Sequence, residues 1–205
     1  MRSIIICAAI LLISNNLKSS ESNLRPVIKW ELGYSAGSEK QPEKWIPATV
    51  PGAVQLDIAK SENYAPYYYA EHWKDYSWME DNYYSYRTNF KNPGLQASER
   101  LYFISEGIDY QFEIYLNGEK IFEQEGMFTP VSFDLTSRLK ENNTLIIKVF
   151  PAPKYNTTPI DRTQASHSVK PAVSYGWDWH PRLIPLGIWD ETYLAIQPAS
   201  CICQR

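Results

Sequence analysis

An Asn-Gly pair between two alternating runs constrains the fold more than any other feature of this sequence. The pair is Asn117-Gly118, with Phe-Glu-Ile-Tyr-Leu at residues 112–116 before it and Glu-Lys-Ile-Phe at residues 119–122 after it. Asn and Gly tolerate the positive φ angles that a type I′ turn requires, so the pattern predicts a β-hairpin. Six further runs interleave β-branched or aromatic residues with polar ones, which is typical of strands that bury one face. These runs are residues 27–32, 83–90, 101–106, 129–134, 144–150 and 191–197.

Two long irregular stretches separate these strands. Helical periodicity is weak throughout, and only a short helix near residues 55–60 is expected. A Tyr-rich loop then runs to residue 81, and its Tyr67-Tyr68-Tyr69 run is read either as a binding platform or as a packed loop. Residues 152–186 contain five prolines and cannot form one regular element. We predict an all-β protein, a single jelly-roll β-sandwich over residues 23–198 with residues 199–205 as a tail.

The first residues read as an export signal. Met1 and Arg2 precede an apolar run at residues 4–13, and polar residues follow at 14–23. A run this short after a positive charge is typical of a signal peptide and is too short to cross a bilayer. We predict a signal peptide at residues 1–22, a secreted or periplasmic protein, and no membrane partner after its removal.

Charge and side-chain chemistry exclude several classes of partner. The formal net charge of -3 and the lack of a basic run argue against nucleic acid or an anionic membrane surface. Cys7 lies in the leader, while Cys201 and Cys203 lie in the tail with no metal-binding set around them. His72 and His167 have no second histidine at ligand spacing. No metal and no cofactor is expected.

Residues 175–182, Tyr-Gly-Trp-Asp-Trp-His-Pro-Arg, hold the densest set of groups that could bind a sugar. The rings of Trp177 and Trp179 could lie against the C–H face of a pyranose, and Asp178 could accept hydrogen bonds from adjacent hydroxyls. A hydrogen bond to an ionised group contributes about 1.5–3 kcal/mol. The alternative is that both indoles fill the core and Asp178 caps a turn. The residues by themselves leave both readings open.

This segment resembles a stretch of the β-mannosidases of glycoside hydrolase family 2. The resemblance rests on Gly-Trp-Asp-Trp at 176–179, Pro181-Arg182 and Gly-Ile-Trp at 187–189. Three further segments are similar and follow in the same order: residues 45–52 with Trp and Val-Pro-Gly, residues 84–90 with Tyr-Arg and Phe, and residues 108–118 ending in Asn-Gly. The resemblance extends from about Trp30 to Gln197.

The resemblance implies a galactose-binding-domain-like jelly roll that packs against a TIM barrel and reaches the mouth of its active site. It also implies that Asp178 hydrogen-bonds the terminal sugar and that Trp177 lines the pocket. Further candidates near the motif, without an assigned role, are Trp179, His180, Arg182 and Lys170.

The sequence departs from the family pattern at two positions. His180 stands where glycine is common, and Asp190 follows Gly-Ile-Trp where arginine is frequent. The change at Asp190 could alter a contact with a neighbouring domain, and both changes bear on the substrate.

The family's catalytic machinery is not expected in these 205 residues. Family 2 enzymes use two glutamates on the strands of a barrel, and a barrel needs about 250 residues. The Asn-Glu pair that carries the family's acid/base occurs nowhere in the sequence. We therefore expect no catalytic residue and no hydrolysis by this chain alone.

Three functions remain in competition. The first is the N-terminal sugar-binding domain of a β-mannosidase-like exo-glycosidase, which hydrolyses O-glycosidic bonds at the non-reducing end, present here without its barrel. The second is a stand-alone secreted carbohydrate-binding module. The third is a docking subunit that completes the site of a partner glycosidase. The expected partners are a β-mannoside-type glycan and the barrel, in cis or as a separate chain.

Overall fold

The computed structural model of the protein describes residues 25–199, so the predicted leader and all but the first residue of the predicted tail lie outside it. The strands are β1 (Trp30–Ser35), β2 (Ile46–Ala48), β3 (Tyr83–Lys91), β4 (Glu99–Ser105), β5 (Ile108–Asp109), β6 (Gln111–Leu116), β7 (Glu119–Glu125), β8 (Val131–Asp134), β9 (Asn142–Val149), β10 (Gly187–Ile188) and β11 (Thr192–Pro198). The helices are α1 (Val54–Glu62) and the 3₁₀ helices η1 (His72–Asp81), η2 (Thr136–Arg138), η3 (Arg162–Ala165) and η4 (Ala172–Tyr175). No helix within these limits is long and apolar enough to cross a membrane.

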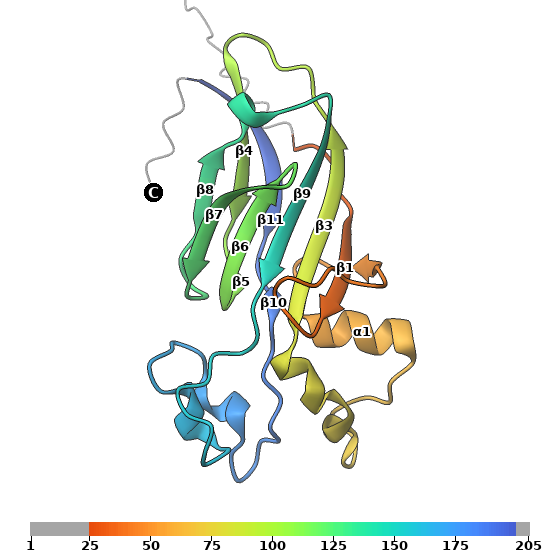
Figure 1. The fold of residues 1–205 in the computed structure, drawn as a ribbon, viewed down its shortest axis with the longest axis vertical. Coiled ribbons are helices and arrows are strands. Elements are labelled where there is room, and N and C mark those ends of the chain that lie inside the picture. Colours follow the sequence, from red (N-terminus) through yellow and green to blue (C-terminus); the bar gives the residue numbers. More distant parts are fainter. Residues whose placement is uncertain (1–24, 200–205) are drawn as a thin grey trace, which may run out of the picture.

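The strands form two layers, as the sequence predicted for a β-sandwich (Figure 1). One layer is a sheet of six strands in the order β2-β1-β3-β9-β6-β7. The other contains the three-stranded sheet β11-β4-β8, and β10 pairs with β5 in a separate two-stranded ladder. Neighbouring strands pair antiparallel throughout.

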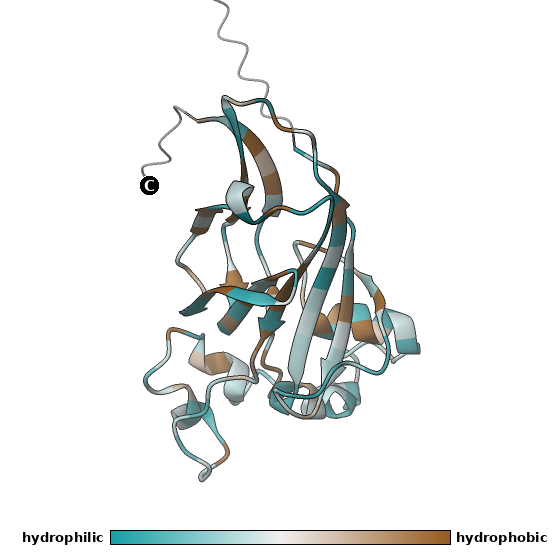
Figure 2. Ribbon diagram, turned by 45° about the horizontal axis from the view of Figure 1, so that its top comes forward, coloured by the Kyte–Doolittle hydropathy of each residue, from teal (hydrophilic) through white to brown (hydrophobic). Residues whose placement is uncertain are grey.

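Alternation along the strands places the core between the layers. In β9 every second residue from Asn143 to Val149 is buried. Brown and teal residues accordingly alternate along several strands in Figure 2. Apolar side chains that the six-stranded sheet buries include Leu32, Tyr84, Tyr86, Ile114, Leu145 and Ile147, and those of the three-stranded sheet include Leu101, Phe103 and Leu194. This shared core fixes the register of each strand, because a one-residue slip would turn its apolar set outward.

Most predicted strands lie within two residues of the observed ones, but the first was placed too early. The sequence predicted residues 27–32, whereas β1 begins at Trp30 and Val27 is 91% exposed. The strand position follows from pairing with β3, from Glu31 opposite Arg87 to Ser35 opposite Tyr83. The short strands β2, β5 and β10 were not predicted, because two or three residues carry too little periodicity.

The predicted hairpin is confirmed. Asn117 and Gly118 join β6 to β7 with φ angles of 55° and 86°, the double positive φ of a type I′ turn. The Asn117 side chain also accepts a hydrogen bond from the Thr144 backbone N–H at 3.0 Å. The turn is thereby tied to β9.

The Gly118→Ala variant should lower the free energy of unfolding by about 1–2 kcal/mol, the cost of a left-handed conformation at a residue with a Cβ. An added Cβ at residue 118 would meet no atom within 4 Å, so the whole effect arises from the backbone. Urea unfolding measures it. The matched control is Gly37→Ala, whose nearest contact would be 3.9 Å away and whose φ is not positive. An equal loss in both variants would contradict the turn assignment.

The long connections gather at one end of the sandwich, here called the loop end. It contains α1, η1 and the segment that carries η3 and η4 (Figure 1). Backbone hydrogen bonds tie this end together: the Val54 N–H donates to Leu186 O at 2.9 Å, and the Ala152 N–H donates to Glu80 O at 2.9 Å. The predicted sugar-binding segment lies here.

Candidate functional site

Residues 177–180 form a tight hairpin, here called the Trp hairpin. The Trp177 N–H donates to His180 O at 2.9 Å, and the His180 N–H donates to Trp177 O at 3.2 Å. Asp178 and Trp179 form its tip, so both side chains project from the protein. Trp177 is 41% exposed and Trp179 is 75% exposed. The alternative that both indoles fill the core is therefore wrong.

Asp178 lies between Trp177 and Trp179 in the chain and has no side-chain partner among the described residues. Its carboxylate is exposed and makes no hydrogen bond or ion pair to any residue within 25–199. It does not cap a turn. All four of its acceptor positions are free for a ligand.

Arg162, at the start of η3, covers one part of the Trp177 ring. Its guanidinium carbon lies 3.8 Å from the ring centroid, which is a cation–π contact of about 0.5–1 kcal/mol at an exposed site. Asp161 caps η3 by accepting a hydrogen bond from the Thr163 N–H at 2.8 Å. The Trp hairpin is thus held against an ordered neighbour.

Arg182 fastens the segment that follows the Trp hairpin to η1, a connection here called the Glu80 latch. Its Nε and Nη2 donate to the Glu80 carboxylate at 2.9 and 2.7 Å, and its Nη1 donates to Tyr175 O at 3.1 Å. Lys154 is also paired with Glu80, at 2.7 Å. The Arg182 side chain is 15% exposed, so its role in this structure is to position the loop.

Lys170 lies inside the protein. Its Nζ lies 2.6 Å from each carboxylate oxygen of Asp109 and donates to Pro185 O at 2.7 Å. These contacts use the three protons of the ammonium group, so none remains for a ligand. Burial raises the pKa of Asp109 and lowers that of Lys170, while their mutual attraction opposes both shifts.

His180, at the end of the Trp hairpin, lines a hollow next to it. Its Nδ1 is 2.7 Å from Pro181 O, and because a carbonyl oxygen only accepts, Nδ1 carries the proton. The hollow has a volume of about 240 Å³. Its lining comes from the start of α1 and from other parts of the loop end: Ala53, Gln55, Leu56, Tyr67, Ser174, His180, Leu183 and Pro185.

Sequence reasoning missed most of this hollow. Gln55 connects its two walls by donating from Nε2 to Ile184 O at 2.8 Å, a contact between segments far apart in the chain. The Tyr67-Tyr68-Tyr69 run was the one available indication. Tyr67 packs against Tyr76 with ring centroids 6.0 Å apart, whereas Tyr68 and Tyr69 are 78% and 68% exposed. The packed-loop interpretation therefore holds for Tyr67, and the binding-platform interpretation stays a prediction.

The structure thus brings four of the six predicted residues together on one hairpin and turns the other two inward. Trp177, Asp178, Trp179 and His180 can face a ligand at the loop end, whereas Arg182 and Lys170 hold the loop in place. The residues from 25 to 199 contain no group of three or more His, Cys, Asp or Glu side chains that could hold a metal ion.

Known proteins with similar sequences include β-mannosidases. The chain is 28% identical to β-mannosidase of Mus musculus over 181 residues, which is 79% of this chain and 20% of that protein. It is 25% identical to β-mannosidase B of Aspergillus flavus over 182 residues, 82% of this chain and 22% of that protein. The chain therefore spans about a fifth of the length of these relatives.

The fold has matches among solved structures. The β-D-mannosidase of Dictyoglomus thermophilum superposes with a TM-score of 0.64 at 28% identity, over 84% of this chain and 22% of that one. The exo-chitosanase CsxA of Amycolatopsis orientalis, at 20% identity and a TM-score of 0.59, shares the fold. The family described as glycosyl hydrolase 2 galactose-binding domain-like matches residues 30–190. The predicted galactose-binding-domain-like sandwich is confirmed, and the chain belongs to this family of glycosyl hydrolase 2 domains.

Proposed function

We propose that this chain is the N-terminal sugar-binding domain of a β-mannosidase-like exo-glycosidase, in which Trp177 and Asp178 contact the sugar at the non-reducing end. The observation that carries the proposal is the Trp hairpin itself. It presents an exposed carboxylate, which has no partner within residues 25–199, on a residue that the exposed Trp177 and Trp179 flank in the chain. An aromatic face and a free acceptor are the groups that a pyranose needs, since its ring has an apolar C–H face and a hydroxyl edge.

A catalytic barrel, in cis or as a partner chain, would complete this site. Large apolar side chains are exposed at the loop end, where they come from α1, from the Tyr-rich loop and from the Trp hairpin: Leu56, Tyr68, Tyr69, Trp177 and Trp179. Where such side chains form one patch, the patch often marks an interaction site. A barrel over this surface would enclose the sugar, and the barrel would supply both glutamates. The predicted leader at residues 1–22 supports a secreted or periplasmic location for the enzyme.

A stand-alone carbohydrate-binding module is the second candidate. One hydrophobic core connects residues of both sheets from Trp30 to Leu194, which supports independent folding. Sequencing the native transcript past the codon for Arg205 separates the two candidates. A downstream barrel with an Asn-Glu element supports the enzyme, and a stop followed by unrelated sequence supports the module.

The Asp178→Asn variant should weaken mannose binding to the chain at least about tenfold, because a hydrogen bond to a charged acceptor becomes one to a neutral amide. Trp177→Ala should have a similar effect through loss of the ring face. Titration with mannose, followed by amide NMR shifts of the Trp hairpin, measures both. The matched control is Asp75→Asn, an exposed carboxylate on η1. Unchanged shifts in the Asp178 variant would count against the proposed site.

A further inference from the structure

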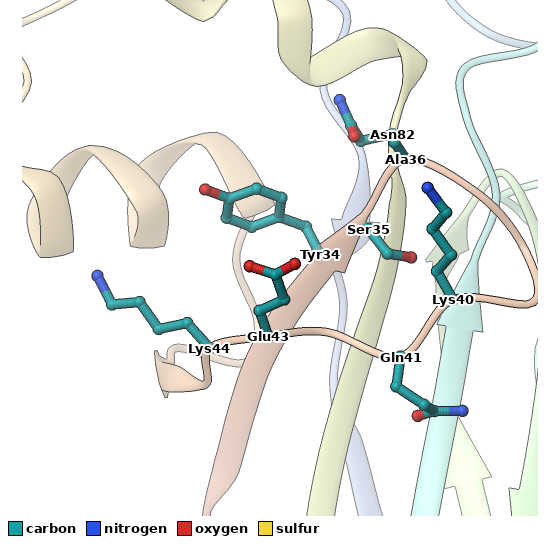
Figure 3. A pocket seen from close by; sticks show the side chains of 8 residues that line it. All are labelled: Tyr34, Ser35, Ala36, Lys40, Gln41, Glu43, Lys44 and Asn82. Carbon is teal, nitrogen blue, oxygen red and sulfur yellow. The ribbon is translucent and has the colours of Figure 1, made fainter.

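A second hollow lies away from the Trp hairpin, between the end of β1 and the segment that leads to β2 (Figure 3). It has a volume of about 450 Å³, within the usual size of ligand sites. It shares no residue with the Trp hairpin or with the hollow next to it. Its lining consists of Tyr34, Ser35, Ala36, Lys40, Gln41, Glu43, Lys44 and Asn82. We call it the Tyr34 pocket.

The wall of the Tyr34 pocket is fixed by contacts outside it. An added Cβ at Gly33 would lie 2.5 Å from the Pro42 side chain and 3.0 Å from Lys44 O, so the segment packs directly on the β1 backbone. Lys148 on β9 donates from Nζ to Ser38 O at 2.7 Å. The Ser35 hydroxyl donates to Gly37 O at 3.0 Å. A pocket held in this way is preorganised, so a ligand would not have to order the loop.

The lining of the pocket includes one aromatic ring, that of Tyr34. Tyr34 packs against Trp78 with centroids 5.0 Å apart, and its hydroxyl makes no hydrogen bond within residues 25–199. Burial, with Glu62 and Tyr64 nearby, raises the pKa of Tyr34, so the phenol is neutral and can both donate and accept. The ring thus offers an apolar surface with a free polar edge.

The rim of the pocket offers donors and acceptors of both signs. The side-chain ends of Lys40 and Glu43 make no hydrogen bond or ion pair within the described chain. In Figure 3 the Glu43 carboxylate points toward Tyr34, with Lys40 and Lys44 on either side. Asn82 donates from Nδ2 to Trp78 O at 2.9 Å, which leaves its carbonyl oxygen free. Because the rim carries charges of both signs, it favours neither an anionic nor a cationic ligand. Hydroxyl groups both donate and accept hydrogen bonds, so they suit such a rim.

We propose that the Tyr34 pocket is a second carbohydrate-binding site, which takes a neutral oligosaccharide. One sugar ring lies on Tyr34, and its hydroxyls bond to Lys40, Glu43 and Asn82. This site goes beyond the proposed function, because it is separate from the Trp hairpin and needs no barrel. Through this site the domain binds a glycan at a sugar other than the terminal one.

Amide NMR titration of the full chain with linear mannohexaose, and separately with cellohexaose, tests this inference. With one of them, shifts should appear at Tyr34 and Asn82. The double variant Lys40→Ala/Glu43→Ala removes two exposed side chains with no net change of charge. It should reduce the size of these shifts at a given oligosaccharide concentration at least tenfold. The matched control Lys91→Ala/Glu141→Ala changes two other exposed side chains at the far end of β3 and should leave them unchanged.

The outcomes separate this site from the proposed function. Absence of shifts at the Tyr34 pocket with both oligosaccharides, or equal shifts in the wild type and in Lys40→Ala/Glu43→Ala, overturns the inference. Shifts at the pocket that persist in Asp178→Asn support it. Pocket shifts without any response at the Trp hairpin would leave the second site standing and count against the proposed one.

Discussion

Replacing Lys170 by Met should lower the free energy of unfolding by about 3–5 kcal/mol near neutral pH, because it leaves the Asp109 carboxylate buried without its partner. The Lys170 and Asp109 side chains are 0% and 3% exposed, so water cannot take the place of the lost ammonium group. The pair also joins two parts of the fold, since Asp109 lies in β5 and Lys170 in the loop before η4. Urea unfolding monitored by tryptophan fluorescence measures the loss.

The pH dependence of this loss identifies its cause. Burial already raises the pKa of Asp109, and without Lys170 nothing would oppose that shift. A carboxyl with a raised pKa binds its proton more tightly in the folded protein than in the unfolded one. The difference in stability between variant and wild type should therefore shrink as the pH falls from about 7 to about 5.

A double variant provides the control for Lys170→Met. Asp109→Leu/Lys170→Met replaces the whole pair by apolar side chains of similar size, which is often neutral for stability. It should be more stable than Lys170→Met alone. A double variant that is less stable, or a loss that does not depend on pH, would mean that side-chain shape rather than the buried charge is responsible.

Glu80→Gln should lower the free energy of unfolding by about 2–4 kcal/mol, since Arg182 and Lys154 both lose their charged acceptor. The Glu80 side chain is 10% exposed, and it connects η1 to the segment after the Trp hairpin. Loosening the latch should also speed hydrogen exchange of the Trp177 and His180 amides, whose mutual hydrogen bonds close the hairpin.

The neighbouring carboxylate serves as the control for the latch. Asp81 pairs with Lys154 at 2.5 Å, but its side chain is 67% exposed. An exposed pair contributes at most about 1 kcal/mol, so Asp81→Asn should change stability little and leave hairpin exchange unaltered. Equal effects from Glu80→Gln and Asp81→Asn would show that the latch does not position the hairpin.

Local patterns predicted most of the longer strands because alternation and turn chemistry depend on residues close together in the chain. The Asn117-Gly118 turn was readable since its geometry needs two particular residue types. The start of β1 was not, because pairing with β3 rather than local alternation decides it. The two-residue strands β5 and β10 exist only as each other's partners, with Gly187 opposite Asp109.

The candidate site likewise has features that the sequence predicted and features that it did not predict. The order Trp-Asp-Trp-His placed four groups on one turn, and its composition predicted what they could bind. The family resemblance gave a role only to Asp178, but residue type by itself did not show that Lys170 is paired with Asp109 whereas Asp178 has no partner within residues 25–199. Both are charged residues in the same irregular loop, and only a partner from a distant strand separates them.

The sequence by itself determined the all-β class, the Asn117-Gly118 hairpin, the family and the candidate residues 177–180, because short-range periodicity, turn chemistry and motif order encode them. Only the tertiary structure decided which charged groups are free, since burial and pairing depend on segments such as Asp109 and Lys170 that lie far apart in the chain. The Tyr34 pocket is also a feature that only the tertiary structure decided. Its lining residues come from β1, the segment after it and Asn82, and the fold alone places them around one hollow.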